Sequence, residues 1–129
     1  MANQTVAELV SADVVGKRAP LERHHLFPKA YLERQGLTSA VDVNQVANLA
    51  IVAWDLNGRI GDQGPDEYWG PLVDEFCQSG ATDADLAAQY RWQALPQGWE
   101  TMGYREFLAE RRQLMASVIR SAFEAMPRA

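Results

Sequence analysis

The chain has 129 residues, of which 47% are hydrophobic and 22% are charged, a balance typical of one globular domain. Its single cysteine, Cys77, excludes an internal disulfide and a four-cysteine zinc site, so we expect packing alone to hold the fold in a reducing compartment. No apolar run approaches the roughly 20 residues of a membrane helix, and the N-terminus lacks the basic and apolar regions of a secretion signal. We therefore expect a cytoplasmic domain with no membrane contact. Its abrupt helical start suggests a fragment of a longer protein.

The formal net charge is −5, from 12 Lys and Arg side chains against 17 Asp and Glu. This acidic balance argues against a protein that coats nucleic acid by bulk charge. Residues 17–36 are locally basic, because five basic side chains stand there against two acidic ones, a balance of +3. The same segment contains both histidines of the chain. A local contact with nucleic acid is therefore compatible with the charge.

In the first half of the chain, apolar spacing predicts a helix over 4–13 and a strand over 21–27, which ends at a proline that cannot donate to a ladder. Helix-forming residues then predict a short helix over 29–35, closed by a glycine. The apolar, partly β-branched segment VANLAIVAW predicts a second strand from about Leu49. Asp55 follows as a candidate N-cap and opens another short helix. Between residue 35 and the second strand, the sequence predicts no further helix or strand.

In the second half, a proline followed by two acids predicts a helix over 65–77. Thr82 is expected to cap a further helix over 83–92. Asp85 stands where a capping box carries Glu or Gln, so the box is only approximated.

The clearest predicted element is a helix over 104–123, whose apolar face recurs at steps of three and four residues. The members of this stripe are Tyr104, Phe107, Leu108, Arg111, Leu114, Met115, Val118, Ile119, Ala122 and Phe123. We expect the stripe to be buried along its length against the helix over 65–77 and against Trp92. Replacement of Leu114 by Ala would then cost about 2–5 kcal/mol. If the stripe is instead exposed, we expect it to be an interface with a missing domain or a second copy.

Several other side chains have ordinary structural interpretations. The four tryptophans are expected to pack in the core or between helices rather than to stack on bases. Arg111 and Arg112 are expected to pair with Glu106, Glu110 or another neighbouring residue rather than to contact DNA. Cys77 is expected to be a small buried residue.

The two histidines, His24 and His25, are adjacent in the segment LERHHLFPK. Adjacent side chains of a regular strand point to opposite faces, so two unrelated surface histidines are the ordinary interpretation. Asn48 at the start of the second strand and Asn57 at the start of the next helix add two amide side chains. Two histidines and two asparagines on a strand–loop–strand–helix pattern are the parts of a one-metal phosphodiesterase.

Hydrolysis of a DNA phosphodiester needs a basic group for the attacking water, a cation near the developing phosphorane charge, and help for the leaving 3′-oxygen. A neutral imidazole can accept the proton of the water. A divalent ion held by an imidazole nitrogen and an amide oxygen can stabilise both the charge and the leaving oxygen. Such a site takes Mg²⁺ or Mn²⁺, and its imidazole can also bind Zn²⁺ or Ni²⁺.

The pattern HHLFPKAYL…NLAIVAWDLNGRIGD…PDEYW resembles the HNH nucleases with a ββα-metal core. More narrowly, it resembles the nuclease domain that closes the GmrSD-type, modification-dependent restriction enzymes. The resemblance covers residues 17–70 and extends more loosely through a helical tail over 65–126. It implies an α+β fold in which 1–129 form a single, mostly helical domain around a small ββα-metal hairpin-plus-helix core.

By this resemblance, His25 occupies the position of the general base and His24 that of a metal ligand. Asn48 matches the central asparagine of the catalytic motif, which holds the loop and orients the base through hydrogen bonds. Asn57 matches the last position of the motif and completes the metal site. The motif is thus an H-N-N variant rather than H-N-H, which weakens metal binding relative to a histidine ligand.

The function implied is that of a metal-dependent DNA endonuclease in restriction or phage defence. Lys29, Arg34 and Arg59 flank the motif and are candidate phosphate contacts, with plain surface solvation at least as good an interpretation for each. The sequence contains no Gly-rich loop that would cradle phosphates, so a nucleotide-hydrolysing recognition domain is expected as an N-terminal or separate partner. A homo-oligomer stays open. The alternative function is a catalytically silent module of the same fold that binds DNA or protein, which the acidic charge favours slightly.

Overall fold

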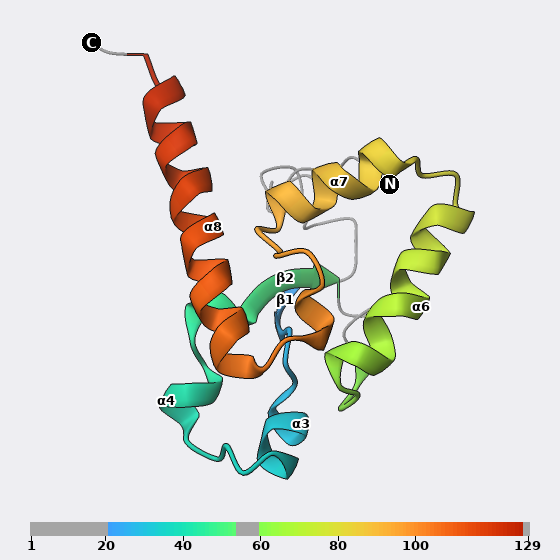
Figure 1. Ribbon diagram of the computed structural model, residues 1–129, viewed down its shortest axis with the longest axis vertical. Coiled ribbons are helices and arrows are strands. Elements are labelled where there is room, and N and C mark those ends of the chain that lie inside the picture. The colour runs from blue at the N-terminus through green and yellow to red at the C-terminus, as the bar shows by residue number, and fades with distance from the viewer. Residues whose placement is uncertain (1–20, 54–59, 128–129) are drawn as a thin grey trace.

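Two paired strands lie at the centre of the structure, and helices surround them (Figure 1). The computed structural model describes residues 21–53 and 60–127. Its elements in chain order are β1 (Leu21–His25), α3 (Lys29–Arg34), α4 (Ala40–Val43), the 3-10 turn η1 (Val46–Asn48), β2 (Leu49–Ala53), α6 (Pro65–Gln78), α7 (Asp83–Trp92), the 3-10 turn η2 (Trp99–Thr101) and α8 (Tyr104–Ala125). The described chain is mostly helical with one small antiparallel sheet, which confirms the α+β class. The helices predicted over 4–13 and after Asp55 lie outside the described residues.

β1 pairs with β2 over its whole length, so that His25 lies opposite Leu49. β1 ends two residues before the strand predicted over 21–27. The reason is that the backbone N–H of Phe27 donates to the side-chain oxygen of Asn48 (2.8 Å) instead of to a strand. β2 begins at Leu49, as the sequence predicts.

The connection between the strands contains α3, α4 and η1. α3 agrees with the predicted 29–35 to within one residue. α4 has no counterpart among the predicted elements, because four residues are too few to form a stable helix on their own. It is held from outside: Val43 is buried, and the hydroxyl of Tyr104 in α8 donates to the carbonyl of Asp42 (2.6 Å). Contacts across the fold therefore decide this helix.

α6 and α7 agree with the predicted helices to within one residue. The capping box of α7 is complete: the N–H of Thr82 donates to the carboxylate of Asp85 (2.8 Å), and the N–H of Asp85 donates to the hydroxyl of Thr82 (3.2 Å). An aspartate thus closes the box that the sequence only approximates, and the hydrogen bond from Thr82 lowers the pKa of Asp85. Cys77, expected to be buried, is exposed because it lies on the outer side of α6.

Aromatic side chains form the core beneath the strands. Phe27, Trp99 and Phe107 are fully buried, with ring centroids 4.8 Å apart for Phe27 and Phe107 and 5.3 Å apart for Trp99 and Phe107. Trp69 of α6 packs against Trp99 at 5.1 Å. The expected packing role is therefore confirmed for Trp69 and Trp99, while Trp54 lies outside the described residues.

α8 is buried only in its first two turns, and Figure 1 shows its second half extending away from the rest of the molecule. Ile119 is 67% exposed, Phe123 75% and Leu114 37%. Trp92 is itself 62% exposed. The prediction that the stripe is buried along its whole length is therefore wrong, and so is the prediction that Trp92 is buried. Because Leu114 is partly exposed, Leu114→Ala should destabilise the fold by less than the roughly 2–5 kcal/mol expected for a buried leucine. Periodicity identifies residues that share a face but not how far a partner covers that face.

No helix within the two described ranges combines the length and the apolar character needed to cross a membrane.

Two phenylalanines on α8 test this division of the helix. Phe107→Ala should lower the free energy of unfolding by about 3–5 kcal/mol, because it empties a fully buried site. Phe123→Ala should change it by less than about 0.5 kcal/mol, because that side chain is mostly exposed. Denaturant titration of both variants measures the difference, and equal losses would contradict it.

Candidate functional site

Asn48 holds the backbone around the two histidines. Its side chain is fully buried, and its oxygen accepts a hydrogen bond from the N–H of Phe27 (2.8 Å). Its amide nitrogen donates to the carbonyls of Phe27 (3.1 Å) and Val43 (3.0 Å). These three bonds join the residues that follow β1, the end of α4 and the start of β2. The prediction that this amide binds backbone in the connection between the strands is confirmed.

His24 and His25 have different surroundings, as expected for adjacent residues of a strand. His24 is 4% exposed, and its ring meets that of Tyr68 edge-on with centroids 5.9 Å apart. His25 is half-buried, and its Nε2 lies 2.7 Å from the side-chain oxygen of Asn44. One imidazole is therefore enclosed by protein, while the other reaches the surface.

Tyr68 joins α6 to this region. Its hydroxyl donates to the carbonyl of Leu26 (2.5 Å), directly after β1. Burial raises the pKa of Tyr68 well above that of a free phenol, so the side chain remains a neutral donor. The motif PDEYW contains this tyrosine, but local sequence gives no sign that its hydroxyl reaches a residue 42 positions earlier.

Arg111 is a buried guanidinium that binds backbone carbonyls. It donates from Nη1 to Ala47 and to Leu49 (2.8 Å each) and from Nη2 to Gln93 (3.1 Å). Burial lowers the pKa of Arg111 to about 10. The expected pairing with a glutamate of its own helix is therefore wrong; the place of Arg111 on the apolar stripe was the available signal that it faces inward.

Arg112, the next residue, donates from Nη2 to the side-chain oxygen of Gln45 (2.9 Å). Its expected glutamate pairing is thus replaced by a contact with the connection between the strands. α8 thereby touches that connection at two neighbouring positions, one buried and one exposed.

The remaining predicted site residues are less defined by the structure. Lys29 is exposed at the first position of α3. Asn57 and Arg59 lie outside the described residues. Within the described ranges, no group of three or more His, Cys, Asp or Glu side chains comes together to hold a metal ion. The predicted ligand pair, an imidazole and an amide, is not of that composition, so it stays a prediction.

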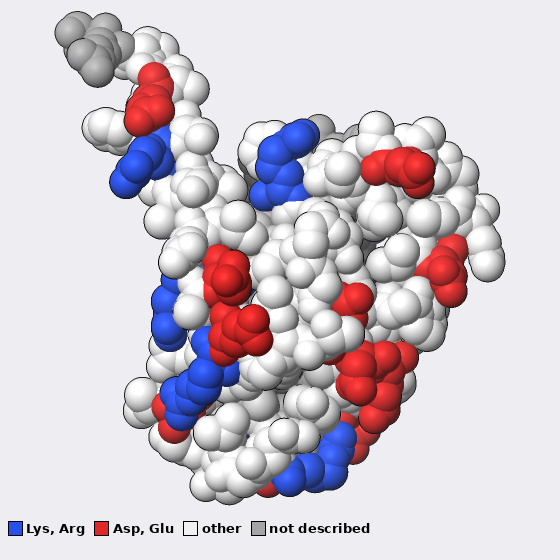
Figure 2. All heavy atoms as spheres, in the orientation of Figure 1, with Lys and Arg blue, Asp and Glu red and all other residues white. Residues whose placement is uncertain are grey.

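Charge is mixed on the face shown in Figure 2. Acidic side chains gather along α6, whose first turn contains Asp66 and Glu67, and basic and acidic side chains alternate along α8. Near α3, Arg34 pairs with Asp62 at 3.7 Å. This face carries no continuous basic surface.

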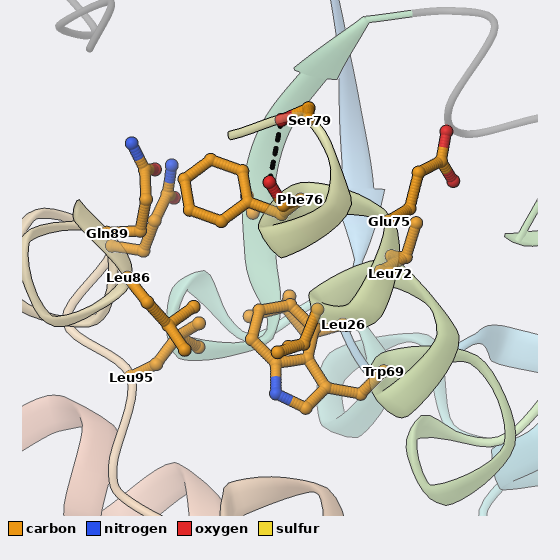
Figure 3. A pocket seen from close by; sticks show the side chains of 12 residues that line it. Leu26, Trp69, Leu72, Glu75, Phe76, Ser79, Leu86, Gln89 and Leu95 are labelled. Carbon is orange, nitrogen blue, oxygen red and sulfur yellow. Dashed lines mark hydrogen bonds between the residues drawn. The ribbon is translucent and has the colours of Figure 1, made fainter. Parts of the chain in front are cut away.

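An apolar cavity of about 400 Å³ lies between α6 and α7 (Figure 3). Trp69 and Phe76 of α6 and Leu86 of α7 line it, and the hydroxyl of Ser79 at its rim donates to the carbonyl of Phe76 (2.6 Å). Neither histidine is part of this lining. Leu26, which follows His25, and Ala50, which pairs with His24 in the sheet, do line it, so the cavity borders the strands from the side of α6 and α7.

The described geometry thus consists of a two-stranded sheet, two histidines in different environments, and a buried asparagine that holds their connection. No family model, curated protein or solved structure matches the chain. The resemblance to HNH nucleases accordingly rests on the residues of the chain itself.

Asn48→Ala should lower the free energy of unfolding by about 2–4 kcal/mol, because a buried N–H and two carbonyls lose their partner. Asn44→Ala is the matched control, since it removes an exposed amide from the same connection and should cost less than about 1 kcal/mol. Denaturant titrations compare the two. A stable Asn48→Ala protein would show that the connection is held by other contacts.

Arg111→Met should destabilise the fold by about 1–3 kcal/mol, because the carbonyls of Ala47, Leu49 and Gln93 lose a shared donor. Arg112→Met removes a neighbouring exposed guanidinium and should change stability by less than about 0.5 kcal/mol. Thermal and denaturant unfolding measure both. If Arg111→Met matches the wild type, methionine packing replaces the guanidinium and the carbonyls do not depend on it.

Proposed function

We propose that the chain is a metal-dependent DNA endonuclease domain of the HNH type, in which His25 is the general base. The observation that carries the proposal is the contrast between the two adjacent imidazoles. His24 is enclosed against Tyr68, whereas His25 is half-buried and bound by Asn44. A general base must reach water and a phosphate at the surface, as the half-buried His25 can. A metal ligand benefits from a fixed ring, which the contact with Tyr68 gives His24. The cation must reach the same phosphate as the base, so the proposal requires both rings to open onto one cleft together with Asn57.

The proposed core consists of β1, β2 and the helix expected after Asp55. The antiparallel pairing of β1 with β2 is compatible with the first two elements of a ββα-metal core. Asn48 supports the proposal as a positioning residue, since its three backbone hydrogen bonds keep β1 and β2 in register around the histidines. It touches no reacting atom in this scheme.

A divalent cation, Mg²⁺ or Mn²⁺ with Zn²⁺ or Ni²⁺ as alternatives, fits the chemistry of the proposed donors, the imidazole of His24 and the amide oxygen of Asn57. When bound, the cation supplies charge stabilisation at the phosphate and at the leaving oxygen. The ring of His24 is suited to this role because Tyr68 packs against it and restricts its orientation.

The substrate in this proposal is DNA. Lys29, exposed at the start of α3, and Arg59 are the proposed phosphate contacts. We place recognition of the target, and any nucleotide hydrolysis, in an N-terminal or separate partner domain of a restriction or phage-defence system in the cytoplasm. The proposal leaves open whether the domain forms a homo-oligomer.

Cleavage of supercoiled plasmid with Mg²⁺ or Mn²⁺ tests the function. His25→Ala should lower the cleavage rate by about 10²–10⁴-fold, the usual loss of a general base, while leaving metal binding nearly unchanged. His24→Ala should weaken both, because it removes a ligand. A chelator should abolish cleavage by the wild type, and added metal should restore it.

Arg120→Ala is the control variant, because Arg120 is exposed on the second half of α8, away from both histidines. It should cleave like the wild type. DNA binding should survive His25→Ala and weaken with added salt as counterions are released less favourably. Equal cleavage by His25→Ala and the wild type would overturn the mechanism. A wild type that binds DNA or protein but never cleaves would instead favour the catalytically silent module.

A further inference from the structure

The side chain of Asn44 contacts the histidine proposed as the general base. Its Oδ1 lies 2.7 Å from Nε2 of His25, although the two residues are 19 positions apart. The contact is at the surface, where water competes for both groups. A polar contact there persists only if the backbone on each side is held in place.

Three hydrogen bonds hold the backbone at and just before Asn44. The N–H of Asn44 donates to the carbonyl of Ala40 (2.9 Å), which closes α4. The carbonyl of Val43 accepts from the buried amide of Asn48 (3.0 Å), and that of Asp42 accepts from the hydroxyl of Tyr104 (2.6 Å). An exposed amide thus stands on a backbone fixed to the core.

The backbone on the His25 side is equally fixed. His25 pairs with Leu49 at the end of the sheet. The next residue donates its N–H to the carbonyl of Asn48 (2.8 Å). Asn48 therefore holds the backbone next to both partners of the contact. Its carbonyl binds the residue after His25, and its side-chain amide binds the residue before Asn44.

The chemistry of the contact determines where the proton of the imidazole sits. An amide oxygen only accepts hydrogen bonds, so a bond from Nε2 to Oδ1 requires the proton on Nε2. A neutral imidazole has one N–H, and the lone pair is then on Nδ1. Asn44 therefore selects which nitrogen is basic.

We infer that Asn44 is a positioning residue that holds His25 in the Nε2–H form and presents Nδ1 to the attacking water. This inference rests on the proposed function of His25. In the step it serves, a proton leaves water for Nδ1 while the water oxygen bonds to phosphorus. The bond from phosphorus to the 3′-oxygen breaks, and that oxygen then takes up a proton from solvent.

The first test is spectroscopic and needs neither DNA nor metal. His24 and His25 are the only imidazoles in the chain, so a long-range ¹H–¹⁵N spectrum resolves both rings, and His24→Gln assigns them. In metal-free protein at about pH 9, His25 should show a protonated Nε2 and an unprotonated Nδ1. Asn44→Leu should move both nitrogen shifts toward those of an exchanging imidazole. Asn44→Asp, which keeps an acceptor oxygen, should retain the wild-type pattern.

The second test is kinetic. Asn44→Leu should lower kcat for plasmid cleavage by about 10–100-fold, as for other groups that fix the tautomer and orientation of a functional histidine. KM should be nearly unchanged, because Asn44 is assigned no contact with DNA. Gln113→Leu is the matched control, an exposed amide on α8 that should leave both the kinetics and the spectrum unaltered.

The outcomes separate the two proposals. Cleavage by the wild type together with unchanged His25 shifts in Asn44→Leu, or with a protonated Nδ1 in the wild type, overturns the role of Asn44 alone. The expected tautomer in a wild type that never cleaves overturns the nuclease function, and the catalytic role of Asn44 falls with it. The expected shifts, a reduced kcat and rescue of the tautomer by Asn44→Asp support both.

Discussion

The amide of Asn48 is the constraint on which the arrangement of the site depends. A single buried side chain binds one N–H and two carbonyls of the backbone in the core. It ends β1 by taking the N–H of Phe27, and from its own place directly before β2 it binds Val43, the last residue of α4. The two strands pair over only five residue pairs, so these hydrogen bonds add to what holds the connection between them.

Arg111 makes a second set of buried hydrogen bonds that joins separate elements. Its partners are backbone carbonyls rather than a carboxylate. The guanidinium binds three backbone carbonyls from η1, β2 and the segment after α7, so one side chain ties α8 to three separate parts of the chain. A guanidinium can do this because its donors form a planar fork, which an ammonium lacks. Beyond Arg111, Arg112 still contacts Gln45 and Met115 still packs against the core, but the apolar stripe becomes mostly exposed from Ile119 onward.

The adjacency of the two histidines gives them different chemistry through strand geometry alone. Alternation places His24 toward Tyr68 and the interior, and His25 toward Asn44 and solvent. Neither environment requires an unusual backbone. What separates the rings is the set of elements on each side: α6 covers His24 through Tyr68, while α4 meets His25 only through one amide. Two adjacent histidines therefore differ in exposure: His24 is enclosed by protein and His25 is accessible to solvent.

The sequence by itself determined the elements whose signals are local. Proline and acids start α6, Thr82 and Asp85 cap α7, β-branched residues form β2, and the period of the stripe defines α8, because each depends on neighbours within about one turn or one strand. The role of Asn48 as a backbone partner also followed, through the resemblance of its motif. Only the tertiary structure decided that α4 forms, which carbonyls Arg111 binds, that half of the stripe stays exposed and that Asn44 meets His25. These depend on groups 18 to 64 residues apart, whose encounter is set by how the elements pack and leaves no local pattern in the chain.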